Sequence, residues 1–181
     1  MPVFSSTEHA PLLRFVRQTI QNRLEHKRLP PLPAFEGLQH KLGCFVTLYR
    51  QGALRGCIGT FDNRQALGTN LSRMALAAAF EDPRFPKVAA PELDEIKIEI
   101  SILGEMRKTV LPEEVEIGRH GIYVQYAGCG GTYLPDVAVE QGWNRDELIR
   151  HCACDKAGLQ PEEIAKADLY IYEVEKIREE T

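Results

Sequence analysis

Cys57 is the residue of this sequence whose neighbours best suit chemistry. It lies in residues 54–61, Leu-Arg-Gly-Cys-Ile-Gly-Thr-Phe, with Arg55 two positions before it. A nucleophilic cysteine needs a nearby cation, amide or base to stabilise its thiolate, and in an extended strand Arg55 and Cys57 would project from one face. Gly56 and Gly59 allow backbone conformations or close approaches that a side chain would forbid. The stretch indicates a thiol site bordered by substrate- or anion-binding residues, or else a structural bend with an incidental cysteine.

A second candidate for binding an anion is Arg84. It lies in residues 82–86, Asp-Pro-Arg-Phe-Pro, a compact turn with one cation and one aromatic ring between two prolines. A guanidinium held in a fixed position can meet an anion or a carboxylate through two parallel hydrogen bonds. The alternative is a rigid connector whose Phe85 fills the core.

Two further residues are candidates for proton transfer. In residues 95–103 isoleucines alternate with Lys97, Glu99 and Ser101, so this strand has one apolar and one largely polar face. The polar face is solvated by default, but Glu99 becomes a candidate acid or base if that face lines a cleft beside the cysteine. His120, in a glycine-flanked turn, is the best candidate base, although the sequence does not place it near the thiol.

The sequence His151-Cys152-Ala153-Cys154 invites comparison with a metal site. Cys152 follows Leu148 by four residues, which places it on the core face of a helix, and no second cysteine or histidine pair has the spacing of a structural zinc site. Buried, unreactive thiols are the more common case. We therefore predict no metal and no cofactor.

Composition excludes several classes of protein. The 181 residues suffice for one domain with a sizeable core. The net charge of −4 argues against a broad nucleic-acid footprint, although a local basic patch remains compatible with it. Neither a signal peptide nor a membrane-spanning run is evident. Five cysteines, an odd number, favour free thiols in a reducing cytoplasm over a disulfide framework.

Periodicity predicts the elements that position these residues. Ser5 and Glu8 have the spacing of a capping box, with Pro11 in the first turn of the helix that follows. Further helices are predicted between 63 and 82, over 136–140 and over 144–157. Strands are predicted at 44–50, 54–61, 95–103, 113–117, 122–126 and 169–174, with the first two forming a hairpin, residues 128–131 irregular and residues 175–181 a charged tail.

The eight residues 54–61 resemble the signature of the AMMECR-type domain family. Collinear matches to that family occur at 44–48, 82–86, 98–103, 121–122, 132–137, 142–143 and 156–159, so the resemblance covers about residues 10–175. Asp136 departs from it, since many relatives carry glutamine there. The resemblance implies an α+β fold with mainly antiparallel sheets flanked by helices, with a larger and a smaller lobe in one compact domain over residues 1–181.

The resemblance also implies a biological setting. Bacterial and archaeal relatives are called component A of the Amme-Memo-RadiSam system, and the family has no settled reaction. One hypothesis is a cytosolic enzyme, or enzyme component, with a cleft centred on Cys57, where Arg55 and Arg84 bind an anion or lower the thiol pKa and Glu99 or His120 handles protons. The alternative is a non-catalytic module that presents Arg55 and Phe61 to a Memo-like or radical S-adenosylmethionine protein. Nucleic-acid binding is the least favoured.

Overall fold

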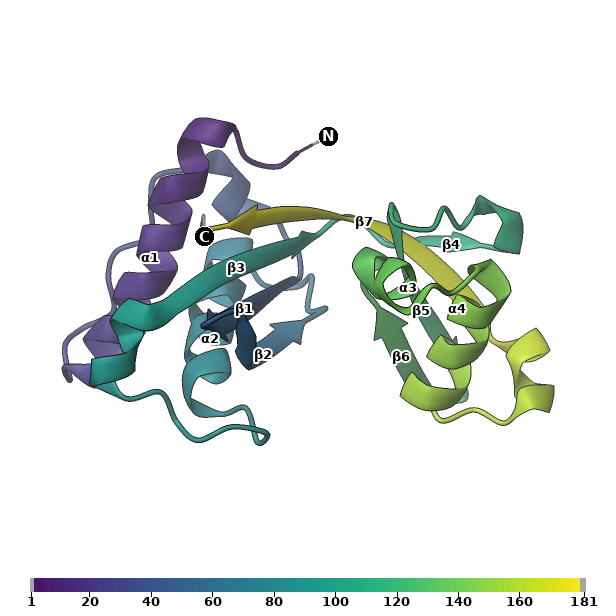
Figure 1. The fold of residues 1–181 in the computed structure, drawn as a ribbon. Coiled ribbons are helices and arrows are strands. Elements are labelled where there is room, and N and C mark those ends of the chain that lie inside the picture. The colour runs from purple at the N-terminus through teal and green to yellow at the C-terminus, as the bar shows by residue number, and fades with distance from the viewer. Residues whose placement is uncertain (1, 180–181) are drawn as a thin grey trace. The chain divides into compact units, whose positions relative to one another are not determined.

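The chain folds as two compact units in the computed structural model, which describes residues 2–179 (Figure 1). Unit 1 contains the chain up to Leu103 and returns at Glu175, and unit 2 is Gly104–Val174. The strand β7 (Asp168–Arg178) therefore contributes its first residues to unit 2 and its last residues to unit 1. Every residue proposed above lies in unit 1 except His120 and the His-Cys-Ala-Cys stretch.

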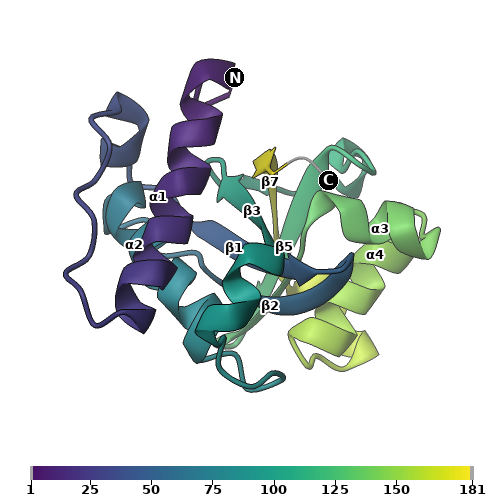
Figure 2. The same ribbon diagram turned by 60° about the vertical axis from the view of Figure 1, so that its left-hand side comes forward.

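Unit 1 is a sheet covered on one face by two helices. Its elements are α1 (Ser6–Leu24), β1 (Cys44–Arg50), β2 (Ala53–Thr60), α2 (Leu67–Phe80), β3 (Ile96–Leu103), the end of β7, and short 3-10 turns at Glu36–Gln39 and Ala90–Glu95. The strand order is β2-β1-β3-β7, and β1 pairs antiparallel with both neighbours. Both helices lie on the same side of these strands (Figure 2).

The first helix begins where the sequence predicts. The backbone N–H of Ser5 donates to Glu8 Oε2 at 2.8 Å, which satisfies one of the donors left unpaired at a helix start. The prediction that Pro11 lies in the first turn is wrong, because Pro11 is the sixth residue of α1. The helix buries Leu12, Val16 and Ile20 against the sheet.

Alternation along the strands separates the two faces of this sheet. The residues of β1 and β3 that point toward the helices are buried and apolar: Cys44, Val46, Leu48, Ile96, Ile98, Ile100 and Ile102. Thr47, Glu99 and Ser101 occupy the other face and are nevertheless buried, with 7%, 8% and 1% of their surface exposed. We expected the polar face to be solvated by default. This holds for Lys97, which is exposed, but not for Glu99, which is buried.

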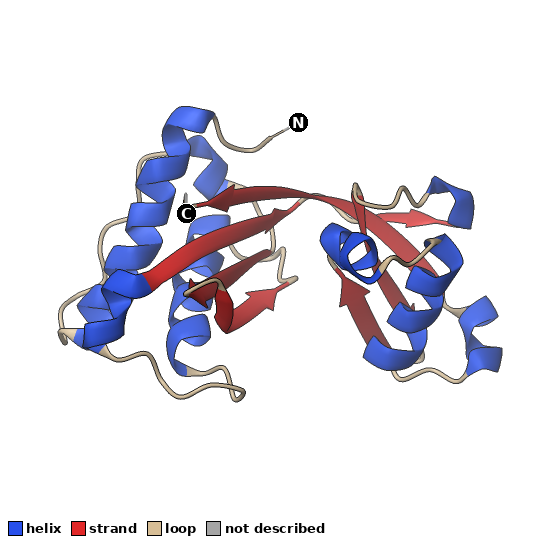
Figure 3. Cartoon of the chain, in the orientation of Figure 1, coloured by secondary structure: helices blue, strands red, loops and turns tan. Residues whose placement is uncertain are grey.

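Unit 2 is a second, smaller sheet with its own core. Its elements are β4 (Arg107–Thr109), β5 (His120–Tyr126), β6 (Cys129–Tyr133), α3 (Pro135–Gln141), α4 (Arg145–His151), a π-helical turn (Cys152–Lys156), 3-10 turns at Pro112–Glu114 and Pro161–Lys166, and the start of β7. The strand order is β4-β7-β5-β6, and every pairing is antiparallel. Ala138 of α3 and Leu148 of α4 pack with Ile122 and Val124 of β5. Figure 3 shows the helices of this unit in blue beside its strands in red.

Three details of unit 2 differ from expectation. Residues 129–131 form part of β6, because a Cβ on Gly131 would come 2.5 Å from Ala157 N, so glycine permits this strand to run against the π-helical turn. Residues 113–117 are not a strand, since Pro112 starts a 3-10 turn there. The predicted helix over 144–157 ends as an α-helix at His151 and continues as the π-helical turn.

The last strand is longer than its pattern indicated. β7 continues through residues expected to form a charged tail, because Ile177 is buried in the core of unit 1 between exposed or half-buried charged neighbours. The α+β class with mainly antiparallel pairing is confirmed, whereas the assignment of residues 1–181 to a single domain stays a prediction. No helix within residues 2–179 combines the length and apolar character needed to cross a membrane.

Candidate functional site

One thiol, one hydroxyl and one carboxylate share a row across the sheet of unit 1. Thr47 of β1 pairs with Cys57 of β2 on one side and with Glu99 of β3 on the other. Residues paired in this way project from the same face with neighbouring Cβ atoms. The row therefore lies on the sheet face opposite the helices, with Cys57 at the β2 end and Glu99 near β7.

The thiol of Cys57 is half-buried and contacts a hydroxyl. Its Sγ lies 3.2 Å from Thr47 Oγ1, so either group can donate a hydrogen bond to the other. A thiolate has no proton to donate, so when the sulfur is ionised the hydroxyl is the donor. Thr47 was not singled out from the sequence, because a threonine inside a strand is ordinary until its register with the cysteine is known.

The backbone of Cys57 is bound on the open side of β2 by the turn at residues 82–86. Its N–H donates to Asp82 Oδ2 at 2.8 Å, and its carbonyl accepts from Arg84 Nη2 at 2.9 Å. β2 ends the strand order, so these backbone groups have no strand beyond them to pair with. The turn closes the edge of the sheet at the cysteine.

Asp82 and Arg84 form an ion pair within that turn. Arg84 Nε donates to Asp82 Oδ1 at 2.9 Å and its Nη2 donates to Oδ2 at 2.7 Å. The Arg84 side chain holds the pKa of the buried Asp82 carboxyl well below its usual range, with help from the backbone N–H of Cys57. The pKa of Arg84 is raised chiefly by its hydrogen bonds to Asp82. Phe85 is half-buried beneath that cation, 5.5 Å from ring to guanidinium carbon, instead of filling the core.

Arg55 is turned away from the row by a β-bulge. The register passes from Leu48 paired with Gly56 to Tyr49 paired with Leu54, so Arg55 is an extra residue and the expected same-face alternation is interrupted. Its Nε and Nη2 donate to the two oxygens of Glu92 at 3.0 and 2.8 Å, and both side chains are nearly buried. Its Nη1 is buried without a hydrogen-bond partner.

The two glycines of the motif have packing roles. A Cβ on Gly56 would lie 2.2 Å from the carbonyl oxygen of Ala78, so the glycine lets α2 approach β2. A Cβ on Gly59 would lie 2.2 Å from the ring of Phe45, which covers that position. Their predicted part in binding a substrate stays a prediction.

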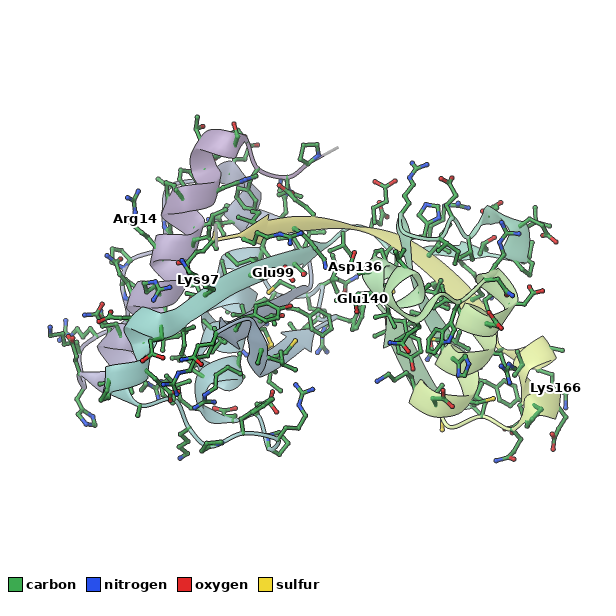
Figure 4. All side chains as sticks on the ribbon, viewed as in Figure 1. Arg14, Lys97, Glu99, Asp136, Glu140 and Lys166 are labelled. Carbon is green, nitrogen blue, oxygen red and sulfur yellow. The ribbon has the colours of Figure 1, made fainter. Side chains whose placement is uncertain are left out.

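Glu99 is a buried carboxylate with two cations of β7 nearby. Its oxygens lie 3.8 Å from Lys176 Nζ and 3.9 Å from Arg178 Nε, distances at the outer limit of an ion pair. Figure 4 marks Glu99 on β3. The carboxylate thus occupies the far end of the row from the thiol, with Thr47 between them.

His120 lies in unit 2, at the start of β5. Its Nδ1 is 3.1 Å from Glu116 N and 3.1 Å from Glu114 O, so the ring is anchored by the preceding turn. It lines a hollow of about 480 Å³ together with Arg119 and Glu173, both of unit 2. Its role as base for Cys57 stays a prediction.

The other cysteines provide internal references for Cys57. Burial raises the pKa of the Cys44 and Cys152 thiols to about 12. Cys129 is exposed and Cys154 is half-buried. Beside them, His151 Nδ1 lies 2.6 Å from Asp155 Oδ2, and residues 2–179 contain no group of three or more His, Cys, Asp or Glu side chains placed to hold a metal.

The fold and the row of residues define a two-unit α+β protein with a cysteine at a sheet edge, and the comparisons with known proteins give its family. The family model AMMECR1 matches residues 13–177, and the chain belongs to this family. Protein MK0488 of Methanopyrus kandleri is 40% identical over 181 residues, covering 93% of this chain and 87% of that protein. Protein MJ0810 of Methanocaldococcus jannaschii is 39% identical over 171 residues, covering 90% and 85%.

A solved structure has the same fold. The crystal structure of the uncharacterized protein PH0010 from Pyrococcus horikoshii superposes with a TM-score of 0.88 at 32% identity, covering 99% of this chain and 95% of that one. The family resemblance inferred from residues 54–61 is therefore confirmed.

Proposed function

We propose that Cys57 is a reactive thiol that acts as the nucleophile, or as the carrier of a transferred group, in an enzyme or enzyme component. The observation that carries the proposal is the position of its half-buried Sγ, 3.2 Å from Thr47 Oγ1, in a residue whose carbonyl accepts a hydrogen bond from Arg84 Nη2 at 2.9 Å. A hydroxyl donor and a fixed cation are the groups that stabilise a thiolate.

Each neighbour then has a distinct part in the chemistry. Asp82 and Arg84 fix the cysteine backbone, and Asp82 orients the guanidinium toward it. When the thiolate attacks an electrophilic carbon, a sulfur–carbon bond forms and the leaving group departs with its electron pair. The thiol proton passes to a base. Glu99 is the candidate within unit 1, and because it lies two strands from Cys57 the proton would travel by way of the Thr47 hydroxyl between them.

The proposal requires a reduced thiol. The reducing cytoplasm predicted from the odd number of cysteines would keep it so.

Alkylation by limiting iodoacetamide tests the proposal, with each cysteine quantified by peptide mass spectrometry. At pH 7 we expect Cys57 to react about fivefold faster than the exposed Cys129 in the same sample, because hydroxyl and guanidinium stabilise the thiolate that displaces iodide. Cys44 and Cys152 should remain unmodified in the folded protein.

Arg84→Gln should remove most of the advantage of Cys57, whereas the matched substitution Arg64→Gln, on an exposed arginine bound to Asp62, should leave it unchanged. A Cys57 that reacts no faster than Cys129 in the wild-type protein would contradict the activated thiol.

The alternative, a binding module for Memo-like or radical S-adenosylmethionine proteins, receives less support from the geometry. Arg55, expected to contact such a partner, is 11% exposed and is bound on two nitrogens by Glu92. Phe61 packs edge-on against Phe45, with ring centroids 5.8 Å apart. Partner capture that is unchanged by Arg55→Ala would agree with this burial and would leave the thiol as the centre of function.

A further inference from the structure

We propose that a hollow beside α1 in unit 1 binds a small phosphate-bearing molecule. The hollow has a volume of about 620 Å³, in the range of small-molecule sites. Four cationic side chains line it, namely Arg14 and Arg17 of α1, Lys97 of β3 and Arg178 of β7, whereas Glu179 is the single carboxylate among its described lining residues. Figure 4 marks Arg14 and Lys97 on α1 and β3.

The carboxylate that lines the hollow is already bound. Glu179 accepts hydrogen bonds from Arg17 Nε and Nη2 at 3.2 and 2.6 Å, and from the backbone N–H of Ile98 at 3.1 Å. Arg17 also donates to the carbonyls of Leu93 and Ile96. This pair is therefore a neutral, fixed wall, and Arg14 and Arg178 are the lining arginines whose side chains are exposed to an incoming anion.

Both of these arginines have exposed side chains. Arg14 is exposed and makes no ion pair within residues 2–179. Arg178 is 70% exposed, and its Nε is 3.9 Å from a Glu99 oxygen that is also near Lys176. A guanidinium presents its donors in a planar fork that matches the oxygens of a phosphate. Like charges gathered on a protein of net charge −4 produce a local positive potential that attracts an anion.

The shape and charge of the hollow favour a small ligand over a nucleic acid. Ala10 and Leu13 supply apolar surface within it, suited to the organic part of a phosphorylated molecule. A long polyanion would extend beyond three cations onto a protein that is acidic as a whole. None of the residues that line the hollow belongs to the row at Cys57, although Arg178 lies 3.9 Å from Glu99, so alkylation of Cys57 and binding of pyrophosphate test the two proposals by separate measurements.

Isothermal titration with pyrophosphate at low ionic strength tests the inference on the full-length protein. We expect the wild-type protein to bind, and Arg14→Gln/Arg178→Gln to weaken the association constant about tenfold, because each exposed charge contact contributes modestly. The matched control Arg28→Gln/Arg64→Gln removes the same charge from exposed positions outside the hollow and should bind as the wild type does. Cys57→Ser should also bind normally.

Three results would overturn the inference. One is an absence of pyrophosphate binding by the wild-type protein at low ionic strength. A second is an equal loss in the control, since this would show that only net charge matters. The third is selective binding of a single-stranded DNA oligonucleotide in place of pyrophosphate, which would make the same surface a nucleic-acid site.

Discussion

Asp82→Ala will lower the free energy of unfolding by about 2 to 3 kcal/mol, because it removes a buried acceptor and leaves its donors without a partner. The carboxylate accepts the backbone N–H of Cys57 and of Arg84 as well as the Arg84 side chain. Arg84 is half exposed and can be rehydrated, which limits the loss. Urea denaturation at pH 7 measures the change.

The chain contains a matched control for this substitution. Asp62 binds Arg64, two residues after it, as Asp82 binds Arg84: the backbone N–H, Nε and Nη2 of Arg64 all donate to the Asp62 carboxylate. It differs from Asp82 in lacking the strand edge as a partner, and Arg64 is 85% exposed. Asp62→Ala should therefore cost much less. Equal losses from the two substitutions would show that the contact with Cys57 contributes nothing.

The contribution of Asp82 to the free energy of unfolding will also depend on pH. Its folded-state pKa is held well below the value of about 3.9 that an unfolded chain has, chiefly by Arg84. A depressed pKa contributes stability that is present above the unfolded value and is lost as the pH falls through the folded value. The difference in unfolding free energy between the wild type and Asp82→Asn should hold near neutrality and shrink below about pH 4. A difference that is unchanged at pH 3 would contradict this origin.

Gly56→Ala will destabilise unit 1 by about 3 kcal/mol, at the upper end for overpacking, because the new Cβ meets the backbone and not a movable side chain. The clash is with the carbonyl oxygen of Ala78, 2.2 Å away, and relief requires β2 and α2 to separate. Thermal unfolding followed by circular dichroism, with urea denaturation for the free energy, measures the loss.

Two other glycines serve as comparisons. Gly142→Ala adds a methyl to open space at a φ of +68° and should cost only about 1 kcal/mol of backbone strain. In Gly59→Ala the new Cβ meets the ring of Phe45. The double variant Gly59→Ala/Phe45→Ala should therefore lose less free energy of unfolding than the sum of the losses in the two single variants. If Gly56→Ala cost no more than Gly142→Ala, the close approach of α2 would not be what requires glycine there.

Local sequence signals predicted the elements well where a spacing pattern is typical of a single kind of element. The capping spacing of Ser5 and Glu8 located the start of α1, and the alternation of isoleucines located β3. The same signals were wrong at Cys129–Tyr133, because whether a glycine-rich run forms a strand depends on what packs against it. They also ended β7 too early, because Ile177 is buried by elements distant in the sequence.

The candidate site was predicted in part. Cys57, Arg84 and Glu99 were singled out from the sequence, and the structure places all three in unit 1. Asp82 and Thr47 were not given a role, although they make the hydrogen bonds that fix the cysteine and its thiol. His120 was proposed from its residue type and its glycine-flanked turn, and it lies in unit 2.

By itself the sequence determined the family, the α+β class and the cysteine at the centre of the motif, because these follow from residue types and from spacings along one strand or helix. Only the tertiary structure decided what surrounds that cysteine. Strand register placed Thr47 between the thiol and Glu99, and a bulge of one residue moved Arg55 out of the row. Register, bulges and edge-closing turns depend on contacts between distant segments, and periodicity within a segment does not encode them.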